Sequence, residues 1–414
     1  MRDYVVEQLK EFQRQNGRVY RLAVVNWGGT LTCVKNKEGL LEPVQKKSEL
    51  EEILLDTLGF RELVEEGLLE MKIIYHKPQD SSQMLDTDRE PVLNILEAEY
   101  LHFDGFLGLH GTDTAAKTAR FLHINLPFFN PRDAWVDGQD SFGWTKPFPI
   151  VSSQEPAAKY VNSKGRKGKF IHFDGSDAGG TIVTAMTALT HPRFAEVGAL
   201  VNREFILRGT AYDKGSESHF KIFSGDEGVP PLGQRTAFGL TFTGPAFNER
   251  PIHQDHSPFV IYGSAEYEKR VLTVSEPAHL EQFTSYLDAV RNKEHETVSR
   301  LRLHIPDAVL YVSKGAGNVQ RDEYDILKSL SDLQGGDVYV ARVPLRGGRV
   351  PAQMHYAVPG GDIPGYNIES STARQKAQSV LALMNSLNIK PEEKRKFFEG
   401  MMRQRFSREY LPHA

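Results

Sequence analysis

The side chains best suited to take part in a reaction lie in the stretch His110-Gly111-Thr112-Asp113-Thr114. The apolar run before it, residues 103–109, predicts a buried strand, and residues 115–122 have the spacing of a helix. Gly111 permits a sharp turn between the two, and we expect Thr112 to cap the helix and Asp113 and Thr114 to occupy its first turn. The loop would then present a hydroxyl beside a carboxylate where α/β sheets bind ligands, although a simple helix cap has the same composition.

Two earlier loops also place polar side chains at the ends of expected strands. Gly28-Gly29-Thr30 ends a strand at residues 19–27, and Asp80-Ser81-Ser82 follows a strand at residues 71–75. Glycines after a strand allow a ligand to approach the backbone closely. Taken alone, the first loop is equally consistent with a plain turn, and the second with an exposed Asx or Ser turn.

Later in the chain, further polar residues follow expected strands. Ser153 comes after a strand at 148–152, and Ser176-Asp177-Ala178 opens a helix that runs to residue 189. A hairpin at 197–202 and 204–207 ends at Arg208-Gly209, shortly before Lys214. Lys214 is the notable cation of this segment, although a lysine is by default a surface residue.

Composition excludes several classes of protein. The chain has 414 residues, of which 40% are hydrophobic and 25% charged, and this length suits two or three domains. Its net charge of -4 gives no sign of a nucleic-acid binder. The basic run at 164–169 is more typical of a solvated loop than of a phosphate site, because no aromatic residues interleave it.

The sequence predicts no disulfide, no metal and no cofactor. Cys33 is the one cysteine, so no internal disulfide can form. His253 and His256 have a spacing that can hold a metal, but such a pair in a linker is more often unliganded. Residues 1–12 read as an amphipathic helix and are too charged for a signal peptide, and no apolar run approaches the ~20 residues that span a bilayer. We therefore expect a cytoplasmic protein with no membrane partner.

Strands and helices alternate up to about residue 189, and a hairpin follows. This order predicts an α/β fold, a doubly wound, largely parallel sheet with a β-hairpin addition, followed by a smaller α/β domain. The smaller domain has expected strands at 271–275, 308–313 and 337–343, helices at 278–290 and 322–333, and closing helices at 371–387 and 391–406. The expected divisions are an N-terminal helical extension (1–18), the catalytic α/β domain (19–245), a linker (246–268), the smaller domain (269–390) and a basic helical tail (391–414).

The order of these motifs resembles that of the bacterial-type L-asparaginases. Gly28-Gly29-Thr30, Asp80-Ser81-Ser82, His110–Thr114, Ser176-Asp177-Ala178 and Arg208-Gly209 with Lys214 occur in the family's order and at comparable separations. The resemblance reaches Lys314-Gly-Ala-Gly-Asn318 and covers roughly residues 22–387. The Asp80-Ser81-Ser82 form is more similar to the cytoplasmic type I branch than to the secreted one.

The resemblance implies hydrolysis of the side-chain amide of asparagine, with an amino acid as the small-molecule substrate and a homodimer or homotetramer as the assembly. It assigns the site as follows: Thr30 and Thr112 line it, Asp113 and Lys214 assist proton transfer, Asp80 and Ser81 hold the substrate's amino and carboxylate groups, Gly111 contacts substrate, and Ser153 lies near the amide.

The chemistry of these side chains is also consistent with such a reaction. A threonine hydroxyl is a poor nucleophile until a neighbour takes its proton, and a lysine can do so only when its pKa falls well below ~10.4. Backbone amides of glycine-rich turns can stabilise the tetrahedral oxyanion. Asp80 can pair with the ammonium group of an amino acid, while Ser81 can receive its carboxylate.

Three positions depart from the family pattern. The family has a tyrosine in the loop after Gly-Gly-Thr, where this chain has Leu40, and no tyrosine occurs between Tyr20 and Tyr75. Thr181 replaces an asparagine, and Ser152-Ser153 replaces Gly-Ala. Alternatives therefore stay open: hydrolysis of glutamine or a larger amide, the ammonia-supplying subunit of a tRNA-dependent amidotransferase, or a non-catalytic amino-acid sensor.

Overall fold

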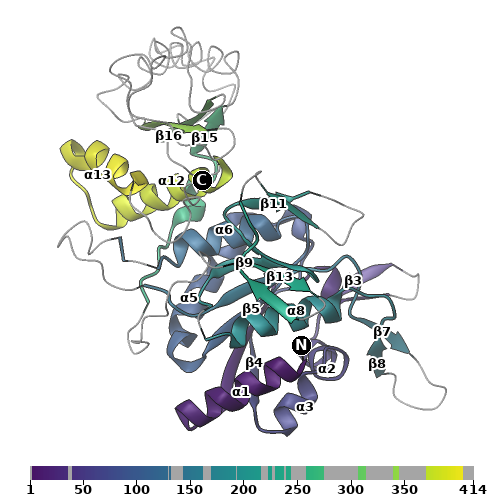
Figure 1. Ribbon diagram of the computed structural model, residues 1–414. Coiled ribbons are helices and arrows are strands. Elements are labelled where there is room, and N and C mark those ends of the chain that lie inside the picture. The colour runs from purple at the N-terminus through teal and green to yellow at the C-terminus, as the bar shows by residue number, and fades with distance from the viewer. Residues whose placement is uncertain are drawn as a thin grey trace. The chain divides into compact units, whose positions relative to one another are not determined.

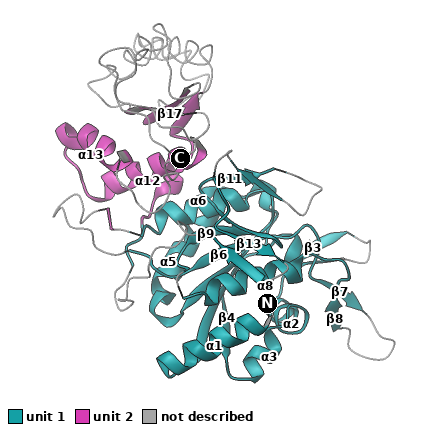
Figure 2. Cartoon of the chain, in the orientation of Figure 1, with its two compact units in different colours: residues 1–128, 141–260 teal, residues 129–140, 261–414 magenta. Residues whose placement is uncertain are grey.

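The computed structural model describes most of the first two thirds of the chain and parts of the rest. The described residues are 2–35, 40–128, 130–131, 143–161, 169–192, 194–215, 222–225, 229–236, 239–243, 258–274, 306–313, 339–344 and 370–403. They divide into two compact units, shown in Figure 2. Unit 1 comprises Met1–Phe128 and Ser141–Val260, and unit 2 comprises Phe129–Asp140 and Ile261–Ala414.

Unit 1 is built on an eight-stranded mixed sheet in the order β14-β13-β10-β9-β6-β5-β1-β4. The five strands from β9 to β4 are parallel, and β10, β13 and β14 add antiparallel pairs at one edge. The bounds are β1 Tyr20–Asn26, β4 Leu69–His76, β5 Gly105–Leu109, β6 Phe148–Val151, β9 Val197–Val201, β10 Phe205–Arg208, β13 Gly233–Thr236 and β14 Gly239–Phe242. The predicted doubly wound sheet and its hairpin addition are confirmed.

Helices cover both faces of this sheet (Figure 1). Helices α1 (Arg2–Asn16) and α8 (Ala178–Thr190) pack against one another, and α8 also lies on β6. Helices α5 (Pro91–Glu99) and α6 (Ala115–Asn125) contact β4 and β9, respectively. Because both faces are covered, the central strands are uniformly buried rather than alternating, as in β5, where all five residues are buried.

Short elements complete unit 1. They are η1 Thr30–Thr32, β2 Cys33–Lys35, β3 Leu41–Pro43, α2 Lys47–Glu52, a π-helical turn Ile53–Thr57, α3 Phe60–Glu65, η3 Ser81–Gln83, α4 Asp86–Arg89, η4 Tyr100–His102, β7 Ala158–Val161, β8 Lys169–His172, β11 Tyr212–Lys214 and β12 Phe223–Gly225. The hairpin of β7 and β8 was not predicted. Lys169, at the end of the basic run, begins β8, and residues 164–168 lie outside the described residues.

The described part of unit 2 centres on a three-stranded parallel sheet. The strands β15 (Val271–Val274), β16 (Ala308–Ser313) and β17 (Tyr339–Pro344) pair in that order, so their amino ends share one edge. Three helical elements accompany them, η6 (Ser264–Tyr267), α12 (Ser370–Ser386) and α13 (Pro391–Arg403). These strands and the two long helices match the expected ones.

Several sequence predictions fall on segments outside the described residues. They are the helices at 278–290 and 322–333, the pair His253 and His256, and the stretch Lys314–Asn318. Within the described ranges, no helix combines the length and apolar character that crossing a membrane requires.

Candidate active site

The strand order of the sheet has its topological switch point between β1 and β5. The chain leaves β1 towards β4 on one side, whereas it leaves β5 towards β6 on the other. The loops that follow these two neighbouring strands therefore diverge, and α/β sheets bind ligands at such a point. The two loops are Gly28–Thr30 and His110–Thr114, both singled out by the sequence.

Glycines bring three of the predicted loops into direct contact. A Cβ atom on Gly29 would lie 2.3 Å from the backbone nitrogen of Gly111, and one on Gly111 would lie 2.2 Å from Oγ of Ser81. Gly29 has a φ of +94°, which an L side chain rarely adopts. The loops after β1, β4 and β5 thus pack against one another through positions where only glycine fits.

The predicted proton-transfer residues meet although 101 positions separate them in the sequence. Nζ of Lys214 lies 2.5 Å from Oδ1 of Asp113, and the lysine side chain is 15% exposed. Thr112, directly before Asp113, is 9% exposed, and no hydrogen bond of its hydroxyl is present among the described residues. A largely buried threonine therefore lies next in sequence to an ammonium–carboxylate ion pair.

Lys214 is held in place by α6, the helix that follows the His110–Thr114 loop. Arg120 on α6 donates to the carbonyl oxygen of Tyr212 at 3.0 Å and forms an ion pair with Asp213 at 2.6 Å. Because Arg120 is almost fully buried, these contacts fix the short strand β11 against α6. Sequence reasoning did not find this arginine, since one arginine within a helix gives no signal of its own.

A buried hydrogen-bond chain supports the loop after β5. Nε of Arg89 donates to Oγ1 of Thr118 at 2.7 Å, and the same hydroxyl contacts Nε2 of His110 at 2.7 Å. The hydroxyl accepts from Arg89, so its proton goes to Nε2, and the His110 proton then resides on Nδ1. That nitrogen lies 2.8 Å from the carbonyl oxygen of Gly111 and donates to it.

Burial keeps this histidine neutral. His110 is completely buried, and desolvation lowers its pKa from the ordinary value to about 3, although the hydrogen bond to Gly111 acts in the opposite direction. His110 is therefore a fixed donor to the backbone beside Thr112. Neither Arg89 nor Thr118 was predicted, because a single polar residue on a buried helix has no recognisable pattern.

One prediction about this loop is wrong. The residue at the N-cap of α6 is Thr114, not Thr112, and no side chain caps the helix. The Thr114 hydroxyl instead donates to the carbonyl oxygen of Ser81 at 2.7 Å. A buried carbonyl needs a donor, so Thr114 links two loops, and Thr112 lies two residues before the N-cap instead of at it.

The Asp80 loop has the local form of an Asx turn. The Asp80 carboxylate is exposed and accepts from the backbone N–H of Ser82 at 2.9 Å through Oδ1, while Ser81 is buried. The charge of Asp80 also acts on Cys33, whose thiol pKa rises to about 12, mainly through burial and secondly through Asp80. Cys33 is therefore an inert neighbour of this loop rather than a nucleophile.

The loop after β6 is fixed by a carboxylate. Asp177, fully buried before α8, accepts from the backbone N–H groups of Gln154 and Glu155 at 3.0–3.1 Å. The Ser153 hydroxyl donates to the carbonyl oxygen of Glu155 at 2.7 Å. The described contacts of Ser153 are thus internal to its own loop.

Two departures from the family pattern are visible in the structure. Leu40 is 65% exposed, and the loop residues directly before it, 36–39, lie outside the described residues. Thr181 is buried on α8 and donates to the carbonyl oxygen of Asp177 at 3.0 Å. In the described part of the chain, no group of three or more His, Cys, Asp or Glu side chains has an arrangement that could hold a metal ion.

The chain has a doubly wound α/β sheet with glycine-rich loops and a threonine at its switch point, and comparison with known families identifies proteins that share these features. Residues 21–131 match the sequence profile of the family described as "Asparaginase, N-terminal". This segment contains β1 and β5 and all three of the loops that meet at Gly29 and Gly111. A search of curated protein sequences finds no significant match.

Solved structures of L-asparaginases share the fold. L-asparaginase I from Vibrio cholerae superposes with a TM-score of 0.66 at 20% identity, and the thermostable L-asparaginase from Thermococcus kodakarensis with 0.62 at 17%, each covering 95% of this chain and 100% of its own. A probable cytoplasmic L-asparaginase from Campylobacter jejuni gives 0.52 at 16%, covering 92% and 99%. The resemblance to bacterial L-asparaginases is thus confirmed for the fold and for the N-terminal segment.

Proposed function

We propose that this protein is an amidohydrolase that converts L-asparagine to L-aspartate and ammonia. The contact between Lys214 and Asp113 carries the proposal, because it joins two distant residues beside a buried threonine at the switch point of the sheet. An ion pair with this placement would serve little purpose in a site that only binds its ligand. The match of residues 21–131 to the asparaginase N-terminal family supports the same reaction class.

In the proposed reaction, Thr112 is the nucleophile. Its Oγ1 forms a bond to the amide carbon of the substrate, and its proton passes to Nζ of Lys214, which accepts it as the neutral amine while Asp113 orients that amine. Backbone N–H groups of the glycine-rich loops stabilise the resulting oxyanion. The C–N bond then breaks, ammonia leaves with the transferred proton, and water hydrolyses the ester to release aspartate and restore Thr112.

The loop after β4 suits the charged end of an amino acid. Asp80 keeps one carboxylate oxygen, Oδ2, outside its hydrogen bond to Ser82, and this oxygen can pair with the substrate ammonium. Ser81 lies against Gly111, which places it beside the nucleophile loop to receive the α-carboxylate. Cytoplasmic location and assembly as a homodimer or homotetramer belong to the same proposal.

The test is ammonia release from L-asparagine and L-glutamine, measured for the wild type and for Lys214→Ala. We expect release from asparagine and a loss of about 10²–10⁴-fold in the variant, the usual range for a proton-transfer group. Lys72→Ala is the matched control, because Lys72 also forms an ion pair, with Glu99 at 3.1 Å, but on the exposed side of β4. Its activity should equal that of the wild type.

Two results would contradict the proposal. Unchanged ammonia release in Lys214→Ala would remove the lysine from the mechanism. Binding of asparagine by calorimetry, without ammonia from either amide and with the protein folded, would favour the amino-acid sensor, which the absence of a tyrosine near Leu40 also favours. Release from glutamine alone would retain the amidohydrolase and change its substrate.

A further inference from the structure

Unit 2 contains a pocket of about 610 Å³ at the amino edge of its sheet. Arg270 and Asp307 stand directly before β15 and β16, and Tyr339 begins β17, so three successive strands contribute to one wall. Tyr267 at the end of η6, helix α12, the turn after it and the start of α13 supply the rest. The lining residues are Tyr267, Arg270, Asp307, Tyr339, Leu381, Met384, Asn385, Asn388, Ile389 and Lys394.

The pocket is not part of the candidate active site. All of its lining residues belong to unit 2, whereas the residues of the asparaginase-like site belong to unit 1. It also lies at the amino edge of the strands, while the motif Lys314–Asn318 in the family resemblance directly follows the carboxyl end of β16. Neither the resemblance nor the proposed hydrolysis accounts for it.

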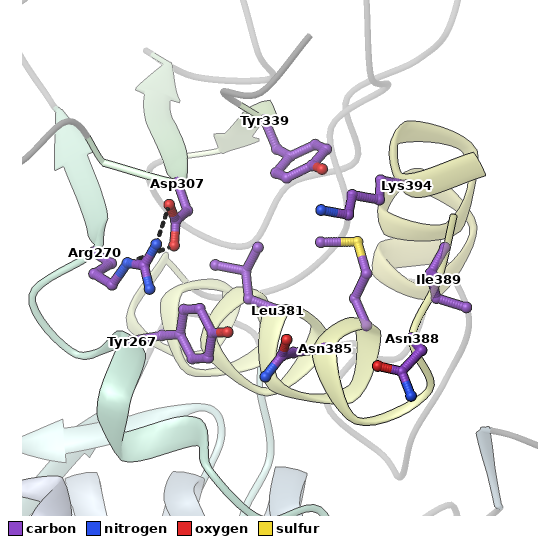
Figure 3. Close-up of a pocket in the computed structure, with 10 residues that line it drawn as sticks. Tyr267, Arg270, Asp307, Tyr339, Leu381, Asn385, Asn388, Ile389 and Lys394 are labelled. Atoms are coloured by element: carbon purple, nitrogen blue, oxygen red, sulfur yellow. Dashed lines mark hydrogen bonds and ion pairs between the residues drawn. The ribbon is translucent and has the colours of Figure 1, made fainter. Parts of the chain in front are cut away.

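The pocket lining has two cationic side chains and one carboxylate among its described residues. Arg270 and Asp307 neutralise one another through two contacts of 2.7 Å, from Nε to Oδ2 and from Nη2 to Oδ1. Lys394 is half-buried on α13 and extends towards the pocket (Figure 3). No ion pair of its ammonium group is present among the described residues, and Asp307 is the one carboxylate in the lining. The described lining residues therefore carry a formal net charge of +1, from Arg270 and Lys394 against Asp307.

The remaining lining residues suit a flat ring with polar edges. Tyr267 and Tyr339 are largely buried, and Leu381 lies between them (Figure 3). Met384 adds a further apolar side chain to the lining. The amides of Asn385 and Asn388 can donate and accept hydrogen bonds. The lining thus combines aromatic and apolar side chains with polar and charged groups, and its accessible surface is more polar than apolar.

We propose that this pocket binds a small organic anion, a planar ring bearing one carboxylate or phosphate group. The anionic group lies at Lys394, the ring lies against Leu381 and Met384 between the two tyrosines, and the asparagines bind its polar edge. Burial raises the pKa of Asp307, although its Arg270 partner and the charge of Lys394 lower it, which indicates that water is partly excluded here and that a charge contact is correspondingly stronger. This inference is independent of the proposed hydrolysis.

The test is calorimetric titration of the full-length protein with two groups of probes. Benzoate and indole-3-acetate represent ring carboxylates, and AMP and UMP represent ring phosphates. Adenosine has the ring without the charge, and inorganic phosphate has the charge without the ring. We expect one ring anion to bind at least tenfold more tightly than both partial probes, and the responding group identifies the source of the anion.

Lys394→Met should weaken that binding by about tenfold or more, because a charge-assisted contact is lost. Lys396→Met is the matched control, since Lys396 is an exposed lysine on the same helix that does not line the pocket, and it should bind like the wild type. Asn385→Leu, at an exposed helical position, provides a second variant and should weaken the same probe several-fold. Failure of all four ring anions to bind at millimolar concentration, or equal binding by Lys394→Met, would overturn the proposal.

Discussion

The two threonines of the candidate active site stand in different surroundings, although each follows a strand of the same sheet. Thr112 has the Lys214–Asp113 pair beside it in sequence and the buried chain from Arg89 to His110 behind its loop. Thr30 begins a short helical turn, and the loop that follows has an exposed Leu40 where the resembling family has a tyrosine. Among the described residues, an ion pair of a lysine and a carboxylate therefore lies next in sequence to Thr112, and none lies next in sequence to Thr30.

This difference suggests how a site can diverge without losing its chemistry. One half of the site, here called the Thr112 half, is the loop after β5 with its buried contacts. These contacts resist substitution, because loss of one partner leaves the other polar group buried without a hydrogen bond. The other half, here called the Thr30 half, is the loop after β1 and the exposed segment that follows it, where a change of sequence costs little stability. Leucine in place of the tyrosine is then tolerable to the fold, and under the proposed mechanism catalysis depends on Thr112.

The largest expected effect comes from removing each hydroxyl in turn. Thr112→Val should lower kcat for ammonia release about 10³-fold or more, because no nearby group can replace the nucleophile. Thr30→Val should have a much smaller effect, tenfold or less, if Thr30 only contacts substrate. Both substitutions preserve the side-chain shape, so steady-state kinetics with L-asparagine compare them directly. A larger loss for Thr30→Val would reverse the assignment of the two halves.

A second prediction concerns the contact of Gly29 with the backbone of Gly111, which joins the Thr30 half to the Thr112 half. Gly29→Ala places a methyl group within 2.6 Å of backbone atoms of His110 and Gly111, at φ +94°. Overpacking and backbone strain together should lower the free energy of unfolding by roughly 2–6 kcal/mol. Gly17→Ala is the control, because Gly17 has φ +65° and no atom within 4 Å of the added methyl, so strain alone should cost about 1–2 kcal/mol. Urea unfolding of both variants measures the difference, and equal losses would contradict the packing of the loops.

Much of this arrangement follows from the sequence. Residues 105–109 are apolar and directly precede His110, so a buried parallel strand and a polar loop at its carboxyl end were predictable. The same argument located the loops after β1 and β4. Their clustering follows from the common edge of parallel strands and needs no knowledge of side chains.

Other features could not be predicted, because they depend on distant partners. The position of Thr114 at the N-cap depends on the Ser81 carbonyl, 33 residues away, and local sequence would favour either threonine as the cap. Arg89 ends a helix of four residues, which is too short to show periodicity. Strands β13 and β14 are short and partly polar, so their pairing is set by the existing sheet edge rather than by their own composition.

A third prediction tests the buried support of the Thr112 half. The pKa of His110 is lowered to about 3, so the unfolded chain takes up this proton first as the pH falls. The contribution to stability is complete above about pH 6.5 and is lost between about pH 6.5 and 3. From pH 7 to pH 5 the wild type should therefore lose about 2 kcal/mol more than His110→Gln. Urea unfolding at both pH values gives the two slopes, and equal slopes would show that His110 is not held neutral.

The smallest expected effect concerns Cys33, in the Thr30 half. Its thiol pKa is raised from 9.0 to about 12 by burial and by Asp80, so at pH 8 the thiolate is about a thousandfold rarer than in an exposed cysteine. Iodoacetamide should therefore leave the folded protein active and unmodified, and should react at an ordinary rate in urea, which exposes the thiol. Mass spectrometry follows both reactions. Rapid alkylation of the folded protein with loss of ammonia release would place a reactive thiol at the site, and the Thr30 half would then have a nucleophile of its own.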